Sequence, residues 1–324
     1  MCTAITYTTN NHYFGRNLDL YYRYNENVVI TPRNYSFRFR NAMDIKRHYA
    51  VIGMAMVVDN YPLYYDATNE KGLSMAALNF PKNAKYNPIK KDVDNIASFE
   101  FIPWILGRCS NISEVKVLLS NINITDVNFS NKYPNSPLHW LIADKDNSIT
   151  VESVEGSLNV YDNPIGVLTN NPPFDMQIFN LNNYINITAK EPVNRFSDKI
   201  NLETYSLGMG GVGLPGDFSS SSRFVRATFV KFNSVICQNE TESISQFFHI
   251  LDAVSQKRGC VSVGNDKYEY TIYSSCCNVD KCIYYYVSYY NRQISGVELF
   301  KEDIESDTLI VYPLQEKQNI NIIN

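Results

Sequence analysis

Apolar and polar residues alternate in short runs along most of this chain, and β-branched and aromatic side chains dominate those runs. Polar turn residues separate one run from the next, as is typical of strands joined by tight turns. Strands are predicted at 3–8, 49–58, 73–78, 140–143, 148–154, 268–273, 283–289 and 309–312. We therefore expect a protein built mainly of β-sheet.

Helical spacing interrupts the strands in three places. Apolar residues recur at i, i+3, i+4 and i+7 over 115–122 and again over 244–251. Ser113 and Thr241 are the predicted N-caps of these two helices. A third helix is predicted over 219–232, where it begins in a run of serines. Runs of strands separated by pairs of helices favour an α+β fold with mainly antiparallel sheets over alternating βαβ units.

The chain shows no internal boundary. No segment rich in Pro, Gly or Ser divides the 324 residues, and no internal repeat occurs at a fixed period. With 44% apolar residues, the chain is long enough to bury a sizeable core. A single domain spanning 1–324 is predicted.

Charge and composition exclude several classes of partner. The net charge of −4 gives no basic surface for a nucleic-acid backbone or an anionic membrane. The first residues lack the basic and apolar regions of a secretory signal, and no apolar run approaches the ~18 residues that a membrane span needs. We therefore expect a soluble cytoplasmic protein that binds neither nucleic acid nor membrane.

Cysteine and histidine spacing gives no metal site. The seven cysteines are an odd number without the density of a disulfide scaffold, so buried free thiols are expected. A zinc site from Cys260, Cys276, Cys277 and Cys282 is disfavoured, because adjacent strand residues point to opposite faces and no C-x-x-C pair occurs. The four histidines show no ligand spacing, and His139 is predicted to be a core residue. We expect neither metal nor cofactor.

One glycine motif occurs in the second half of the chain. Residues 208–213 match G-x-G-x-x-G, but they continue into Leu214-Pro215-Gly216 instead of opening a helix. A dinucleotide site is therefore not expected there, and we predict a flexible loop.

The first twenty residues carry the clearest candidate chemistry. Strand-like runs at 3–8 and 13–18 are separated by a polar turn, which predicts a β-hairpin. A turn centred near Asn10 places Cys2 opposite Leu18, with Arg16 and Asp19 flanking the thiol. Strict alternation puts Arg16 and Asp19 on opposite faces, so the strand must bend or end between them if both serve Cys2.

A cysteine at position 2 carries a thiol and, once Met1 is removed, a free α-amine in the same residue. The amine titrates near working pH and suits general base catalysis, whereas the thiol needs activation. Arg16 would favour the thiolate, and Asp19 could orient the amine. An edge-strand cysteine beside an ordinary turn explains the same residues equally well, and the geometry alone leaves both interpretations open.

A resemblance along the whole chain decides between them. The motifs that carry it are Met1-Cys2-Thr3, Phe14-Gly15-Arg16-Asn17-Leu18-Asp19, Asn69-Glu70-Lys71-Gly72-Leu73, Leu78-Asn79-Phe80, Leu138-His139-Trp140, Gly166-Val167-Leu168-Thr169-Asn170-Asn171-Pro172, Gly213-Leu214-Pro215-Gly216-Asp217-Phe218 and Ser222-Arg223-Phe224. With these motifs the sequence resembles the choloylglycine hydrolase family of N-terminal-nucleophile hydrolases, most closely the bacterial conjugated bile salt hydrolases.

The resemblance implies a four-layer αββα sandwich, often assembled as a homotetramer. It implies Cys2 as nucleophile with Arg16 and Asp19 beside it, and an oxyanion hole from Asn79 and Asn170. Arg223 completes the polar set. The implied reaction cleaves the amide between a bile acid and glycine or taurine through a thioester on Cys2, and the conjugated bile salt is the expected partner.

Two alternatives stay open beside this function. Penicillin V acylases of the same family tend to carry tyrosine where this chain has Asn79, which favours the bile salt substrate. A binding protein that kept the fold and lost activity is disfavoured, because every matched polar residue is present. Two positions depart from the family, since Ala77 and Cys282 stand where relatives often have glycine.

Substrate contacts are predicted from position and apolarity. Arg16, Leu18 and Asn79 are expected to touch the substrate near the scissile amide. The steroid is expected to lie on apolar side chains from the loop after Asp19 and from the loop between residues 127 and 137, and the candidates are Tyr24, Phe129, Tyr133 and Leu138. These apolar side chains could also be ordinary core residues, and for Leu138 the two interpretations have equal support.

Overall fold

The computed structural model describes residues 1–324 and contains two large antiparallel sheets that face each other. The first sheet has the order β12-β1-β2-β14-β15-β16, with β13 paired to β14. Its strands are β1 (Cys2–Thr8), β2 (His12–Leu20), β12 (Val167–Leu168), β13 (Val261–Gly264), β14 (Lys267–Asn278), β15 (Ile283–Ser288) and β16 (Ser295–Glu298).

The second sheet has the order β11-β10-β9-β6-β5-β4-β3-β17. Its strands are β3 (Asn27–Thr31), β4 (Val51–Val58), β5 (Tyr61–Asn69), β6 (Ser74–Asn79), β9 (Leu138–Ala143), β10 (Ser148–Val154), β11 (Ser157–Asp162) and β17 (Ile310–Pro313). A separate parallel pair is formed by β7 (Asp94–Ala97) and β8 (Ile122–Thr125).

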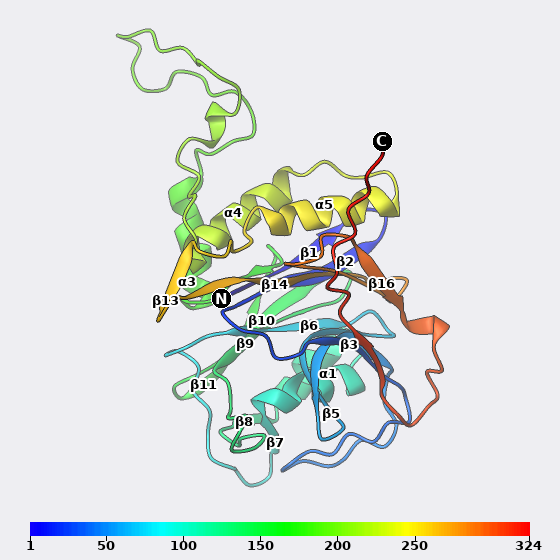
Figure 1. Ribbon diagram of the computed structural model, residues 1–324. Coiled ribbons are helices and arrows are strands. Elements are labelled where there is room, and N and C mark those ends of the chain that lie inside the picture. The colour runs from blue at the N-terminus through cyan, green and yellow to red at the C-terminus, as the bar shows by residue number, and fades with distance from the viewer.

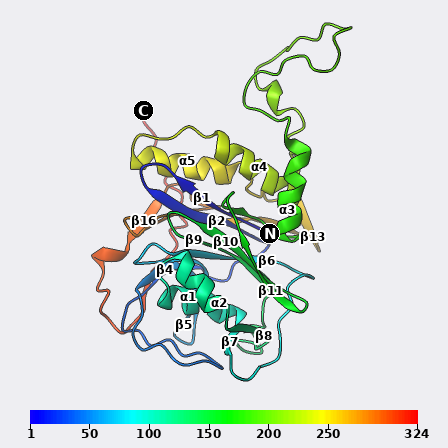
Figure 2. The same cartoon turned by 180° about the vertical axis from the view of Figure 1, so that it is seen from behind.

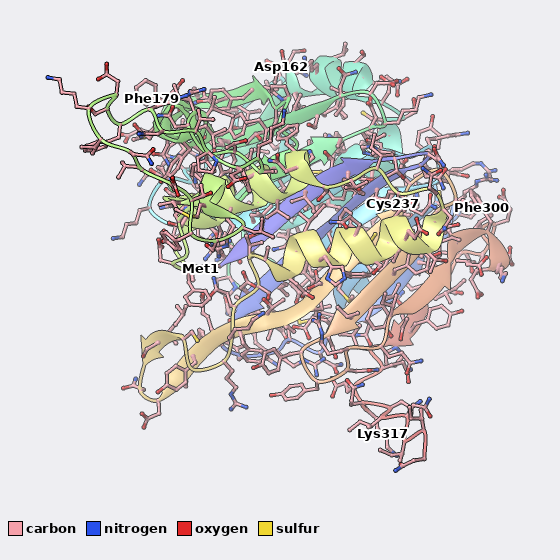
Figure 3. All side chains as sticks on the ribbon, turned by 90° about the horizontal axis from the view of Figure 1, so that it is seen from above. Met1, Asp162, Phe179, Cys237, Phe300 and Lys317 are labelled. Carbon is pink, nitrogen blue, oxygen red and sulfur yellow. The ribbon has the colours of Figure 1, made fainter.

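Helices cover the outer face of each sheet. They are α1 (Phe101–Arg108), α2 (Ile112–Leu119), α3 (Phe174–Asn180), α4 (Ser220–Asn233) and α5 (Glu240–Asp252). Figures 1 and 2 show α4 and α5 on the first sheet and α1 and α2 on the second, so the layers run helix, sheet, sheet, helix. Seen from above, α4 and α5 lie on top of the first sheet and run roughly along its strands (Figure 3). The predicted α+β fold and the four-layer sandwich are confirmed.

Two buried clusters match these layers. One of 39 residues fills the space between the sheets and beneath α4 and α5, and includes Leu78 and Phe247. The other, of 27 residues, lies between the second sheet and its helices and includes Trp104 and Trp140. Each sheet buries both faces, which explains strands such as 51–56 with no exposed residue. None of the helices combines the length and apolar character that crossing a bilayer requires.

The predicted helix caps were wrong in two cases. The side chains of Asn111 and Asn239, two residues before the predicted caps, accept hydrogen bonds from the third backbone N–H beyond them. Asparagine ranks with serine as an N-cap, so the choice depended on where each helix starts. The first helix also ends earlier than predicted, at Leu119. Ile122, the last apolar position of the predicted helical pattern, instead begins β8. The third helix is confirmed, with Ser219 as its cap.

Candidate active site

Cys2 is the first residue of β1 and is buried between the two sheets, only 2% exposed. It pairs with Leu18 across the β1–β2 hairpin, as the turn at Asn10 predicted. Met1 precedes it and bonds to the backbone of Asp19 in both directions. The hairpin register alone thus places the thiol beside Leu18 and Asp19.

The irregularity expected in this hairpin lies in the neighbouring strand. β2 continues to Leu20 without a break, whereas β14 carries an extra residue between Thr271, opposite Asp19, and Tyr273, opposite Leu18. β2 therefore does not end between Arg16 and Asp19, and the irregularity is an extra residue in its partner strand. A bulge in the partner strand re-aims side chains in the same way while leaving β2 continuous.

Arg16 crosses from the first sheet to the second and is fully buried. Its Nη1 donates to the carbonyl oxygens of Tyr65, at 2.9 Å, and Ala77, while Nη2 has no partner. Burial alone lowers the pKa of Arg16, but nearby anionic groups, led by the Cys2 thiolate, raise it above its usual value. The guanidinium therefore stays charged next to the thiol.

Asp66 crosses between the sheets in the opposite direction. Its carboxylate accepts hydroxyl hydrogen bonds from Tyr273 and Tyr284 at 2.6 Å and from Ser275 at 3.0 Å. The Ser275 hydroxyl also accepts from the backbone N–H of Arg16 at 3.1 Å. Burial raises the pKa of Asp66, and the charge of Arg16 partly offsets that rise. Asp66 thus supports Arg16, a role that sequence reasoning missed because its partners lie more than 200 residues away.

Asp19 is fully buried beside the bulge. Its Oδ1 accepts from the hydroxyl of Thr271 at 2.6 Å, and its Oδ2 has no partner. Burial raises the pKa of this carboxyl, while the ammonium of Met1 and the guanidinium of Arg223 lower it in part. An acceptor with free lone pairs therefore lies next to the chain terminus.

Asn170 and Arg223 approach Cys2 from the opposite side. Oδ1 of Asn170 accepts from the backbone N–H of Cys2 at 2.8 Å and from Nη2 of Arg223 at 2.7 Å. Arg223 also donates from Nη1 to the carbonyl oxygen of Cys2 at 2.5 Å and to the hydroxyl of Thr3 at 2.6 Å. Burial lowers the pKa of Arg223, and the negative charges of Asp19 and Cys2 oppose that shift.

Asn79 lies at the end of β6 in contact with this group. Its backbone carbonyl accepts from Nδ2 of Asn170 at 2.7 Å. Its own side-chain amide makes no hydrogen bond within the protein and is half-buried. The structure thus brings the five other predicted polar residues into one cluster around Cys2.

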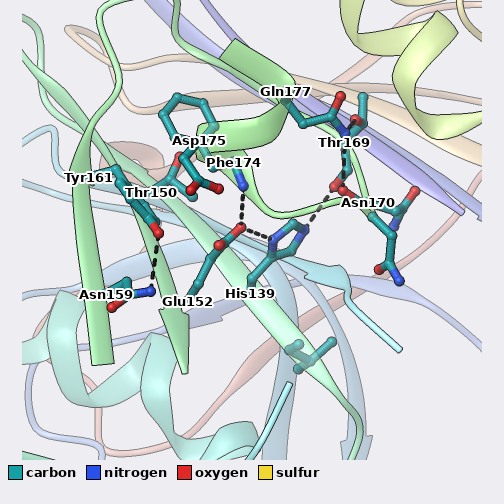
Figure 4. Close-up of polar contacts among 12 residues, drawn as sticks. His139, Thr150, Glu152, Asn159, Tyr161, Thr169, Asn170, Phe174, Asp175 and Gln177 are labelled. Atoms are coloured by element: carbon teal, nitrogen blue, oxygen red, sulfur yellow. Dashed lines mark hydrogen bonds and ion pairs between the residues drawn. The ribbon is translucent and has the colours of Figure 1, made fainter. Parts of the chain in front are cut away.

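A buried polar network holds the segment that carries Asn170 (Figure 4). His139 lies between Oε1 of Glu152, 3.0 Å from Nδ1, and the carbonyl oxygen of Thr169, 2.9 Å from Nε2. Gln177 donates to the carbonyl oxygen of Asn170 at 3.3 Å. The ring of His139 stacks on Phe80 and is completely buried. His139 is therefore the satisfied core histidine that the sequence predicted, and it contacts no reacting group.

The predicted apolar contacts are spread more widely. Leu18 is buried in the core and Leu138 is half-buried opposite Asn79. Phe129 and Tyr133 are half-buried and pack against each other with ring centroids 6.4 Å apart. No hydrogen bond or ring contact joins them to the polar cluster.

Tyr24 is half-buried, and its hydroxyl contacts that of Tyr22. The contact joins neighbouring residues of the loop after β2 and involves no member of the polar cluster. Tyr24 therefore remains a candidate on position alone.

The cysteines form no metal site. All seven are free, and Cys260 is exposed while Cys276, Cys277 and Cys282 are buried. No group of three or more His, Cys, Asp or Glu side chains is arranged to hold a metal ion. Cys282 adopts φ of +52°, which accounts for the glycine expected at this position in relatives.

A four-layer sandwich with a cysteine at the start of its first strand, held among amide and guanidinium groups, defines an amide hydrolase with an N-terminal nucleophile. A sequence model of the family of linear amide C–N hydrolases, choloylglycine hydrolase family, matches residues 2–312. The chain belongs to this family and is a linear amide C–N hydrolase.

Relatives and solved structures agree. The chain is 54% identical to a bile salt hydrolase/transferase of Lactiplantibacillus plantarum over the full length of both proteins. It is 39% identical to a bile salt hydrolase/transferase of Clostridium perfringens, again over both whole chains. A crystal structure of the C2A mutant of conjugated bile acid hydrolase from Clostridium perfringens superposes with a TM-score of 0.92 at 38% identity, covering both chains completely.

A more distant structure shares the fold alone. Penicillin V acylase from Agrobacterium tumefaciens superposes with a TM-score of 0.75 at 22% identity, covering 96% of this chain and 90% of the acylase.

Proposed function

We propose that this enzyme hydrolyses the amide bond of bile salts conjugated with glycine or taurine, through a thioester on Cys2. The observation that carries the proposal is the closed set of contacts that fixes Cys2 between Asn170 and Arg223. The substrate class is supported by the full-length identity to bile salt hydrolase/transferases of two organisms.

Acylation begins at the thiol. Removal of Met1 frees the α-amine of Cys2, which takes the thiol proton as the sulfur attacks the scissile carbonyl. The charge of Arg16 favours the thiolate, and Asn170 holds the nitrogen through Oδ1. The α-amine is thus oriented by the contact that already positions the Cys2 backbone.

Charge then develops on the carbonyl oxygen. The free side-chain amide of Asn79 and the second Nδ2 hydrogen of Asn170 are the donors we assign to this oxyanion. Collapse of the tetrahedral intermediate expels the amine with a proton from the Cys2 ammonium. Water, activated by the same amine, then releases the bile acid.

The acyl group can also pass to an amine instead of water. Both relatives are named hydrolase/transferase, and a thioester reacts with amines as well as with water. Acyl transfer to an amino acid is therefore our second candidate activity. Penicillin V acylase activity has no comparable support, because the acylase structure is too distant in sequence to extend beyond the fold.

We also propose that the enzyme is a homo-oligomer, with the tetramer as the expected form. Residues 185–216 project as an arm away from the sandwich (Figure 1). The arm exposes large apolar side chains, including Phe196 at 81%, Tyr205 at 86% and Leu207 at 96%. Exposed apolar side chains gathered on one segment mark an interaction surface.

Amino-acid release from glycocholate and taurocholate tests the proposed substrate directly. The protein is first checked by intact mass for loss of Met1, and penicillin V is assayed in parallel. Release of glycine or taurine at a higher kcat/KM than penicillin V cleavage supports the proposal. Absence of release from Met1-free protein would exclude bile salts as the substrate.

A further inference from the structure

Met1 is bound in the site by its backbone and by its ammonium group. The ammonium donates to the carbonyl oxygen of Asp19 at 2.6 Å and to Oε1 of Glu269 at 3.0 Å. The backbone N–H of Asp19 donates back to the carbonyl oxygen of Met1 at 2.8 Å. The structure therefore shows where a cationic amine binds next to the nucleophile.

Glu269 has no other cationic partner within ion-pair distance. Its side chain, in β14, is only 15% exposed, and its Oε2 is buried without a hydrogen bond. A carboxylate in such surroundings is stabilised by a cation and is costly to leave unpaired. Processing of the terminus removes the ammonium of Met1 and leaves Glu269 and the Asp19 carbonyl as acceptors.

These acceptors lie where the amine of the reaction must lie. Two atoms of the chain separate the Met1 nitrogen from the Cys2 nitrogen, so they are roughly 3–4 Å apart by standard backbone dimensions. A leaving amine that takes its proton from the Cys2 amine needs a nitrogen at hydrogen-bond distance from it, about 2.6–3.2 Å. The position of the Met1 ammonium therefore approximates that of the amine nitrogen released from the substrate.

We propose that Glu269 and the carbonyl oxygen of Asp19 form the amine subsite of the enzyme. This subsite holds the ammonium of the amino acid after C–N cleavage and binds the primary amine that accepts the acyl group in transfer. In transfer the bound ammonium first gives one proton to the Cys2 amine, and the neutral nitrogen then attacks the thioester carbon. The C–S bond breaks with its electrons going to sulfur, and the sulfur takes up the second proton of the amine. This inference rests on the proposed function.

The test is the partition of the acyl-enzyme between glycine and water. Wild-type enzyme and Glu269→Gln, both verified as Met1-free, are given glycocholate or taurocholate with added isotope-labelled glycine, and labelled conjugate is measured against free bile acid. Loss of the carboxylate removes a charge-assisted hydrogen bond, so the ratio of transfer to hydrolysis should fall about tenfold. Glu269 is partly exposed, so folding is expected and is checked by the melting temperature.

Two controls separate amine binding from other effects. Asp266→Asn makes the same charge change at an exposed site and should leave the ratio unchanged. Hydroxylamine, largely uncharged at neutral pH, should partition equally in wild type and Glu269→Gln. An unchanged glycine ratio in Glu269→Gln would overturn the amine subsite, as would an equal fall for hydroxylamine. Failure of the proposed function is distinct, because wild-type enzyme would then release no amino acid from either bile salt.

Discussion

The two sides of the site are built in different ways. On one side, Cys2, Arg16 and Asp19 all belong to a single hairpin, and its register fixes their spacing. On the other side, Asn79 ends β6, Asn170 lies two residues after β12, and Arg223 belongs to α4. In the mechanism we propose, the hairpin supplies the reactive groups, whereas the opposite side supplies hydrogen-bond donors whose positions depend on the packing of the whole fold.

The two sides of the site should therefore respond differently to substitution. The hairpin side contains charges that must be compensated, and it does this with buried partners such as Asp66 and Thr271. The opposite side depends on exact placement of neutral amides, which the His139–Glu152 network supports through the Thr169 carbonyl. Substitutions on the two sides should therefore change different kinetic quantities.

The largest effect is expected on the hairpin side, at the nucleophile. Cys2→Ser keeps the α-amine and the backbone contacts but replaces the thiolate by a far weaker nucleophile, and the structure holds no other base to activate it. We expect kcat to fall by at least about a thousandfold with little change in melting temperature. Steady-state amino-acid release measures this, and substantial turnover in Met1-free protein would place the nucleophile elsewhere.

The next largest effect is expected on the opposite side, at Asn79. Asn79→Ala removes an amide that is free in this structure and is assigned to the oxyanion, so its loss acts in the transition state. We expect kcat to fall about 10²–10³-fold while KM changes little. A higher KM with normal kcat would instead show that Asn79 only binds substrate.

A smaller effect is expected from Thr271→Val, which removes the hydroxyl that bonds Asp19. Burial already raises the pKa of Asp19 and the hydroxyl of Thr271 helps to lower it, so the substitution raises it further. We assign the ionised carboxylate to help orient the free Cys2 amine beside Asn170, so the acid limb of the kcat/KM profile should move to higher pH. At neutral pH we expect about a tenfold loss. If the acid limb of Thr271→Val lies at the same pH as in the wild type, the ionisation of Asp19 does not control kcat/KM.

The smallest effects are expected from the apolar candidates away from the polar cluster. Phe129→Ala and Tyr133→Ala each remove part of a half-buried aromatic surface, worth about 25 cal/mol per Å² no longer covered by substrate. KM for bile salts should rise severalfold while kcat stays the same. If both folded variants show the wild-type KM, the loop between residues 127 and 137 does not contribute to the steroid pocket.

The sequence predicted the hairpin side of the site better than its surroundings. Strand alternation and the turn at Asn10 were sufficient to pair Cys2 with Leu18, because hairpin register depends on local residues. The bulge that serves Asp19 lies in β14, some 250 residues away, and no local pattern of β2 could indicate it.

The hydrogen bonds around Asp66 could not be predicted from the sequence either, because they join residues that are far apart along the chain. In the sequence, Asp66 is one polar residue next to apolar and aromatic residues. Its hydroxyl partners Tyr273 and Tyr284 look like ordinary aromatic residues of a strand. Only the packing of one sheet on the other brings them together. On the opposite side of the site, Asn79, Asn170 and Arg223 could be named only through the family resemblance, since their contacts join distant segments.

The central claim is that Cys2 acts as nucleophile and as its own base, so the decisive measurement is activity against the processing state of the terminus. In this structure Met1 is present and the Cys2 nitrogen is an amide that donates to Asn170. Protein in which Met1 is retained, by inhibiting methionine removal during expression, is compared with processed protein after intact mass has fixed the fraction of each. We predict that amino-acid release scales with the Met1-free fraction and vanishes without it. Full activity in verified Met1-bearing protein would contradict the mechanism.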